Sequence, residues 1–226
     1  MNNNDNFSLN NKVYLTGEVS TEPKYSHELF GEGFYEFYAN VPRLSGSVDV
    51  LPITVSERIL PKDLKVGDKI SLIGQFRSYN KLENDKSKLM LTVFVRDFLP
   101  FDENEQNPNI AELNGYVCKT PVYRTTPFNR EICDLLIAVN RGYNKSDYIP
   151  CIAWGRNARY VRDVKVGQNV QISGRIQSRK YVKRIDEEIM QERTAYELSI
   201  NKIGCESAVA ETASTIESKD DEYNSD

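Results

Sequence analysis

The 226-residue sequence is poor in the residues on which most enzymes and metalloproteins depend. His27 is its only histidine, and the four cysteines, Cys118, Cys133, Cys151 and Cys205, form no CxxC pair. A histidine-based catalytic or metal site is therefore nearly excluded, and we expect buried, reduced thiols. The sequence also lacks a GxxxxGK[ST] phosphate loop, an HExxH motif and a nucleophile elbow. We expect a protein that is not an enzyme and holds no metal or cofactor.

Long hydrophobic runs are missing as well. No apolar stretch approaches the about 20 residues of a membrane span, and the asparagine-rich residues 1–10, which we expect to be flexible, lack the apolar segment of a secretion signal. Charged residues make up 27% of the chain and hydrophobic ones 39%, which is ordinary for a soluble globular protein. The expected location is the cytosol, with no membrane partner.

One module occurs twice in the chain. With a shift of 98 residues, Pro52 aligns with Pro150; after a two-residue insertion the shift is 100, and Gly74 aligns with Gly174. Glycines and prolines mark turns and bends, so aligned ones indicate aligned backbone events. Two copies of this length are typical of tandem globular domains.

The domain boundaries follow from composition. We place domain 1 at residues 11–99 and domain 2 at 111–205, separated by the polar linker 100–110 and followed by an acidic tail, 206–226, which we expect to be disordered. The net charge of the chain is −4, but the charges are unevenly distributed: domain 2 carries 16 Lys and Arg against 10 Asp and Glu. A basic domain between acidic segments is compatible with a nucleic-acid partner.

Each domain is predicted to contain five strands. Glycines inside two of them favour a small closed barrel of the oligonucleotide-binding (OB) type, with a five-stranded sandwich as the alternative. A short helix is expected between strands three and four of each domain, at 156–163 and, as helix or turn, at 56–63. The predicted strands are 12–19, 34–41, 48–55, 69–77 and 90–98, then 111–117, 131–139, 147–154, 169–177 and 194–203.

Four stretches of domain 2 match a known pattern in order and spacing. They are residues 114–121, residues 135–141, residues 149–156 with their aromatic-Gly-basic ending, and residues 174–181 with their basic-aromatic ending. Through them, domain 2 resembles the bacterial single-stranded DNA-binding protein family and its relative, primosomal replication protein N. The resemblance implies sequence-independent binding of single-stranded DNA in DNA replication, repair or recombination, by a nucleoid-associated protein.

The resemblance also implies the binding residues. In the family, bases stack on aromatic rings at the positions of Tyr148, Trp154 and Tyr181, and Tyr148 and Trp154 share one face of a strand because side chains alternate. Tyr143 lies in a loop that is shorter than in the family. The candidate phosphate ligands are Arg156, Arg159, Arg175, Arg179, Lys180, Lys183 and Arg184. The alternatives are a buried Trp154, an edge-capping Tyr148 and an ordinary solvated hairpin at 180–184.

Domain 1 lacks this set. Trp154 aligns with Ser56, Tyr148 with Val50, and Tyr181 with a lysine, so we expect domain 1 to have a structural or oligomerising role. Domain 1 keeps Tyr35, Tyr38 and Tyr79, which leaves weak binding through another face open as the alternative. The family implies a homodimer with four barrels. The tail is acidic but has no terminal Pro-Phe, the sequence that recruits replication proteins in the family. Two other functions remain open: a primosome-like or RNA-binding accessory factor, and an interaction scaffold without nucleic acid.

Overall fold

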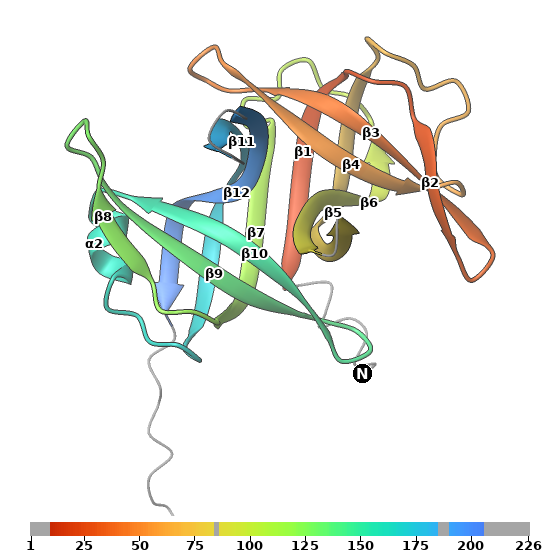
Figure 1. Cartoon of the computed structure of the whole chain (residues 1–226). Coiled ribbons are helices and arrows are strands. Elements are labelled where there is room, and N and C mark those ends of the chain that lie inside the picture. Colours follow the sequence, from red (N-terminus) through yellow and green to blue (C-terminus); the bar gives the residue numbers. More distant parts are fainter. Residues whose placement is uncertain (1–9, 84–85, 185–189, 206–226) are drawn as a thin grey trace, which may run out of the picture.

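The computed structural model describes residues 10–83, 86–184 and 190–205, and most of these residues lie in strands (Figure 1). The prediction of an all-β protein is therefore confirmed. Domain 1 contains β1 (Asn11–Val19), β2 (Lys24–Leu29), β3 (Glu32–Pro42), β4 (Val48–Ser56), β5 (Lys69–Glu83) and β6 (Lys86–Leu99). Domain 2 contains β7 (Asn109–Val117), β8 (Val122–Thr125), β9 (Glu131–Arg141), β10 (Lys145–Trp154), α2 (Arg156–Val161), β11 (Asn169–Arg184) and β12 (Met190–Cys205).

The long strands of each domain pair in a ring. In domain 1, β1 pairs with β5, β5 with β6, β6 with β4 in parallel, β4 with β3, and β3 again with β1. Domain 2 repeats this order with β7, β11, β12, β10 and β9. Alternating side chains point inward and fill the interior, where Phe37, Phe76, Ile137 and Ile176 are fully buried.

Two glycines explain how the longest strands bend. The pairing register shifts between Ile73 and Gly74 in β5 and between Ser173 and Gly174 in β11. A Cβ atom at Gly74 would lie 2.4 Å from a carbonyl oxygen of β6, and one at Gly174 would lie 2.1 Å from a carbonyl oxygen of β12. The neighbouring backbone approaches too closely for any other residue, so the glycines found in the sequence mark real irregularities of the strands.

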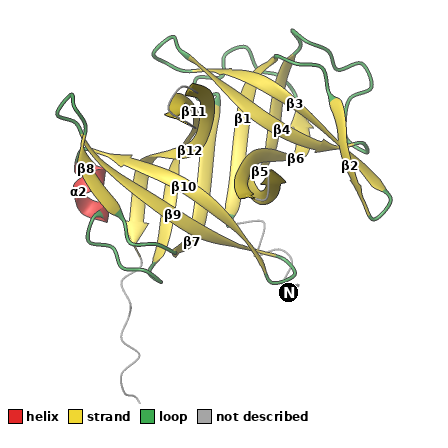
Figure 2. Ribbon diagram, in the orientation of Figure 1, coloured by secondary structure: helices red, strands yellow, loops and turns green. Residues whose placement is uncertain are grey.

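The prediction of a helix in each domain is wrong for domain 1. Figure 2 shows α2 in domain 2, where Arg159 N–H donates to the carbonyl oxygen of Gly155. The corresponding residues 57–68 of domain 1 form turns. Leu60 N–H begins a helical turn by donating to the Ser56 oxygen, but the next residue is Pro61, which has no N–H and disfavours helical backbone before it.

Two strands were missed by the sequence prediction. β2 and β8 lie at the two edges of the sheet and pair only with β3 and β9. Every side chain of β2 is exposed, so its sequence shows no alternation of polar and apolar residues. Within the described residues, the only helix is far too short to cross a membrane.

The two domains form one continuous sheet. β1 pairs antiparallel with β7, from Asn11 opposite Leu113 to Leu15 opposite Asn109. Equivalent side chains of the two domains form equivalent hydrogen bonds at this junction. Asn11 Oδ1 accepts a hydrogen bond from the Phe76 N–H at 2.8 Å, and Asn109 Oδ1 accepts one from the N–H of the equivalent residue in β11 at 2.9 Å.

The strands β5 and β11 each reach across to the other domain. Ser178 N–H donates to Asp49 Oδ1 at 2.6 Å, and Ser78 N–H donates to Asp147 Oδ1 at 2.8 Å. Both aspartates are buried, at 0% and 2% exposure. Because a buried carboxylate requires hydrogen-bond partners, each domain depends on the other to satisfy its aspartate.

Candidate nucleic-acid interface

The outer surface of β9 and β10 carries two of the predicted stacking residues. Along β10, Asp147, Ile149, Cys151 and Ala153 are buried, whereas Tyr148 and Trp154 on the opposite side are exposed. The predicted common face of Tyr148 and Trp154 is therefore present. Trp154 follows Tyr148 by six positions, which corresponds to roughly 20 Å along an extended strand.

The three predicted aromatic residues have similar exposure. Tyr148 is 45% exposed, Trp154 39% and Tyr181 36%. Each ring therefore packs partly against the protein and leaves part of its surface to solvent. The alternative of a tryptophan sealed in the core does not hold. A partly supported ring loses little conformational freedom when a base stacks on it, which favours binding.

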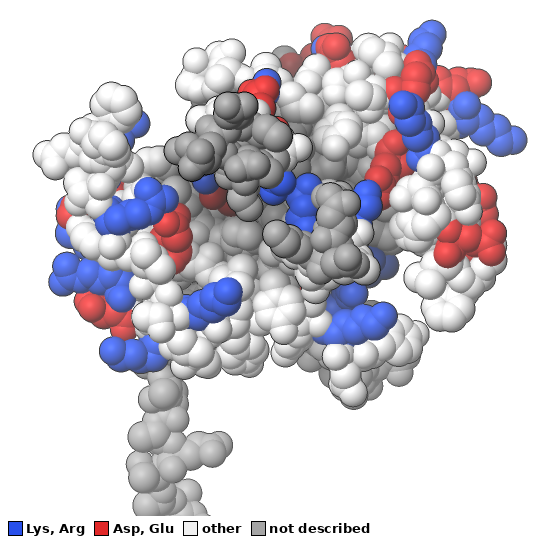
Figure 3. Space-filling model, viewed as in Figure 1, with Lys and Arg blue, Asp and Glu red and all other residues white. Residues whose placement is uncertain are grey.

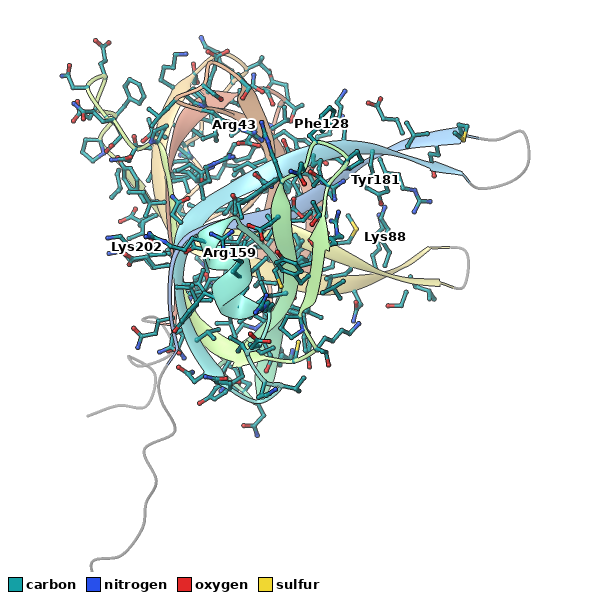
Figure 4. All side chains as sticks on the ribbon, turned by 90° about the vertical axis from the view of Figure 1, so that its left-hand side faces the viewer. Arg43, Lys88, Phe128, Arg159, Tyr181 and Lys202 are labelled. Carbon is teal, nitrogen blue, oxygen red and sulfur yellow. The ribbon has the colours of Figure 1, made fainter. Side chains whose placement is uncertain are left out.

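Tyr181 lies on the hairpin formed by β11 and β12. The guanidinium carbon of Arg179 lies 5.8 Å from the centre of its ring. Figure 4 shows this hairpin and the β5–β6 hairpin projecting from the same side of the molecule, with Tyr181 on the first and Lys88 on the second. An aromatic ring beside a cation on a projecting arm can hold a base and its phosphate together.

The predicted cations of the hairpin form weak surface ion pairs. Lys180 Nζ lies 3.3 Å from Glu192 Oε1, and Arg179 Nε lies 3.6 Å from Glu197 Oε1. Both cations are more than half exposed. The Lys180–Glu192 pair is exposed on both sides and contributes at most about 1 kcal/mol, so a phosphate can replace this carboxylate at small cost. Glu197, in contrast, is buried. The side chains of Lys183 and Arg184 lie outside the described residues.

Three other predicted cations lie elsewhere. Arg175 donates from Nη1 to Asp49 Oδ2 at 3.1 Å, which places it in the junction between the domains. Arg159 on α2 is paired with Glu131 and lies well away from Tyr181 in Figure 4. Arg156, the first residue of α2, is exposed. The structure therefore brings Arg179, Lys180 and Tyr181 together but not the whole predicted set.

Tyr143 is at the tip of the turn between β9 and β10. Its side chain is 99% exposed, and its φ of 61° is in the left-handed region that a tyrosine rarely occupies. None of the residues that the structure describes covers this ring. An exposed aromatic residue in a costly backbone conformation is often part of a binding site.

Comparison with known proteins identifies the same family as the sequence resemblance. The model of the single-strand binding protein family matches residues 108–205. Single-stranded DNA-binding protein 1 of Clostridium acetobutylicum is 42% identical over 79 residues, which cover 30% of this chain and 70% of that protein. The chain belongs to the single-strand binding protein family. Single-stranded DNA-binding protein 1 of Staphylococcus aureus is 35% identical over 80 residues, so the chain spans only about half (48%) of that relative.

A solved structure extends the likeness to both domains. The single-stranded DNA-binding protein from Thermus aquaticus superposes with a TM-score of 0.71 at 16% sequence identity, covering 90% of this chain and 96% of that one. At this identity the match concerns the fold alone. Its coverage nevertheless includes domain 1, which lies outside the residues matched by the family model.

Domain 1 presents a different outer surface from that of family-matched domain 2. At the positions of Tyr148 and Trp154 it has Val50, 41% exposed, and Ser56, which is buried. The Ser56 hydroxyl donates to a carboxylate oxygen of Glu32 and so serves the fold. The prediction that domain 1 lacks the stacking residues comes from aligning Tyr148 with Val50 and Trp154 with Ser56. In the structure neither of these two positions carries an aromatic ring.

Sequence reasoning missed Phe128. This residue lies at the tip of the β8–β9 turn and is 87% exposed. Figure 4 labels it on this turn, which Figure 1 shows at the outer end of β8 and β9. Its neighbours Pro127 and Asn129 mark a turn, and an exposed aromatic residue in a turn next to a basic strand was the available signal.

Proposed function

We propose that the protein binds single-stranded DNA without sequence preference. The observation that carries this proposal is the placement of three half-exposed rings, Tyr148, Trp154 and Tyr181, on the outer surface of β9–β10 and on the adjoining hairpin. Bases stack on these rings, while Arg179, Lys180 and Arg156 contact the backbone. Stacking does not depend on base identity because every base has a flat aromatic face.

Each ring of five paired strands acts as an OB-fold barrel in this proposal. The order of pairing, the parallel contact of the third and fifth long strands, and the fold likeness to the Thermus aquaticus protein support that assignment. The protein works in replication, repair or recombination, in the bacterial cytoplasm and at the nucleoid. Two copies form a homodimer with four barrels, as the family resemblance implies.

The test is titration with oligo-dT at several salt concentrations. Trp154 is the only tryptophan, so its fluorescence reports on the proposed contact. We expect quenching on binding and a steep fall of affinity with salt, since phosphate contacts release counterions. Binding that does not depend on salt would favour the scaffold alternative, and preference for RNA over DNA would favour the accessory-factor alternative.

Substitutions locate the binding surface. Trp154→Ala combined with Tyr181→Ala should weaken dT binding far more than Tyr35→Ala combined with Tyr38→Ala, because each stacked base contributes about 1–3 kcal/mol. Labelled dT and fluorescence anisotropy replace the lost tryptophan signal. Tyr116→Ala is the matched control, since Tyr116 is also 45% exposed but lies on β7. Equal losses in both double variants would refute the proposed division between domains.

A further inference from the structure

Domain 1 contains a cleft on the surface equivalent to the β9–β10 face. Its volume is about 600 Å³, and β2, β3, β4 and the β5–β6 hairpin form its walls. The lining includes three aromatic residues and three cations, namely Phe34, Tyr79, Phe94, Arg77, Lys81 and Arg141. Domain 1 therefore has aromatic rings and positive charge on this surface, but at positions that alignment with domain 2 does not identify.

Arg77 is unusual because it is largely buried and Asp147, the acidic group that acts on it, forms its salt bridge with Arg141. Its guanidinium carbon lies 3.8 Å from the centre of the Phe94 ring, and its Nη2 donates to the neutral Gln75 Oε1 at 2.7 Å. Among the described residues, Arg77 forms no salt bridge. Burial, and next the charge of Arg141, lower the pKa of Arg77 to about 10. The charge of Asp147 acts in the opposite direction, but this one carboxylate is shared between Arg77 and Arg141. An anion in the cleft would supply a second negative charge for the two guanidinium groups.

The second arginine of the cleft comes from the other domain. Arg141 ends β9 and is 32% exposed at its side chain, and its Nη1 lies 3.4 Å from Asp147 Oδ1. Among the described residues of the lining, Glu36 is the only acidic one, and it already accepts a hydrogen bond from Ser26 at 2.8 Å. Figure 3 shows several Lys and Arg side chains near the middle of this face, between the domains, with Asp and Glu side chains beside them. The cleft thus favours an anionic ligand.

One hydrogen bond links the cleft to the stacking surface of domain 2. Ser78 lines the cleft, and its Oγ accepts a hydrogen bond from the Tyr148 N–H at 2.7 Å. The cleft therefore begins where the β9–β10 surface ends. A strand that stacks on Tyr148 and continues beyond it meets Arg141, Arg77 and then Tyr79, whose ring is 43% exposed.

We propose that this cleft is a second subsite for the same single strand, in which Arg77 and Arg141 hold one phosphate and Tyr79 stacks on a base. The inference rests on the proposed function and adds domain 1 to the binding path. An acidic peptide would also satisfy the two guanidinium groups. The strand is the better occupant because Tyr79 and the His27 ring, stacked on Phe34 at 5.1 Å, offer flat faces that such a peptide does not use.

The test compares a short and a long oligonucleotide on Arg77→Gln. OB folds cover about 4–16 nucleotides each, so dT of about 8 nucleotides occupies domain 2 alone, whereas dT of about 30 reaches the cleft. For the short probe we expect an unchanged affinity. For the long probe we expect the affinity to fall about 10-fold, and the slope of log affinity against log salt concentration to become smaller in magnitude by about 0.7. Arg77→Lys should restore the salt slope of the long probe. Lys62→Gln, in an exposed turn of domain 1, is the control and should change the affinity for neither probe.

The outcomes separate the two proposals. An unchanged affinity and slope for the long probe would overturn the second subsite, as would an equal loss for both probes. Displacement of the long probe by polyglutamate from the wild type but not from Arg77→Gln would assign the cleft to acidic peptides and also overturn it. Wild-type protein that bound neither probe would refute the proposed function itself. Tyr79→Ala, which leaves the buried arginine in place, should lower affinity for the long probe only.

Discussion

Asp49 is the residue whose removal should most damage the junction between the domains. It is fully buried and accepts hydrogen bonds from Arg43 Nε at 2.6 Å, Arg175 Nη1 at 3.1 Å and the Ser178 N–H at 2.6 Å. Its hydrogen bond raises the pKa of Arg43, whereas burial and then Arg43 lower the pKa of Arg175. In Asp49→Ala, two neighbouring guanidinium groups would lose the carboxylate between them.

We predict that Asp49→Ala lowers the free energy of unfolding by about 3–5 kcal/mol, the usual cost of leaving a buried charge without its partner. Both arginines are 26–30% exposed, so partial hydration favours the lower end of that range. Asp147→Ala should cost less, about 1–3 kcal/mol. Asp147 has a single, longer arginine contact at 3.4 Å, and burial raises its pKa, so its charged form is less well compensated.

The measurement is urea unfolding followed by circular dichroism and by Trp154 fluorescence. Asp97→Ala, at an exposed position of β6, is the control and should stay within about 0.5 kcal/mol of the wild type. A loss below about 1 kcal/mol for Asp49→Ala, or a larger loss for Asp147→Ala, would show that these hydrogen bonds do not hold the domains together as inferred.

Three further predictions concern single positions. Gly174→Ala should lower the free energy of unfolding by about 1–3 kcal/mol, because its Cβ would lie 2.1 Å from a carbonyl oxygen; wild-type stability in urea would show that β12 can yield. Tyr143→Gly should raise the free energy of unfolding by about 0.5–1 kcal/mol, because glycine adopts this positive φ without strain. The same substitution should weaken dT binding, and a gain in affinity would exclude the ring from the site. In a Cys118→Ser, Cys205→Ser background, which leaves only the two buried thiols, a disulfide reagent should label the protein slowly at pH 8 and faster towards pH 11. The reason is that burial raises the pKa of Cys133 to about 11 and that of Cys151 further. Rapid labelling at pH 8 would contradict their burial.

The inward-facing residues made much of the fold predictable. The alternation of side chains in β10 is enough to predict that Tyr148 and Trp154 lie on one side of the strand, and Gly74 and Gly174 coincide with register shifts. β2 could not be predicted, because an edge strand with every side chain exposed needs no apolar pattern. The helix expected in domain 1 failed at Pro61, where a local backbone restriction outweighs the analogy with domain 2.

Charge was less predictable than stacking. Arg175 and Arg179 are four residues apart in one basic strand and are indistinguishable by composition. The structure uses Arg175 to compensate buried Asp49 and leaves Arg179 half exposed beside Tyr181. Which arginine is available to a phosphate depends on the partner domain that packs against β11, and no pattern local to the strand contains that information.

The two copies have remained alike where they touch and differ where they face solvent. Asp49 and Asp147 keep equivalent hydrogen bonds to the opposite hairpin, because each domain needs the other to satisfy a buried carboxylate. No such requirement acts on the outer surfaces, where exposed Tyr148 corresponds to exposed Val50. The stacking residues of domain 2 and the buried cation Arg77 of domain 1 can therefore serve one strand of DNA, because both lie on the same continuous sheet.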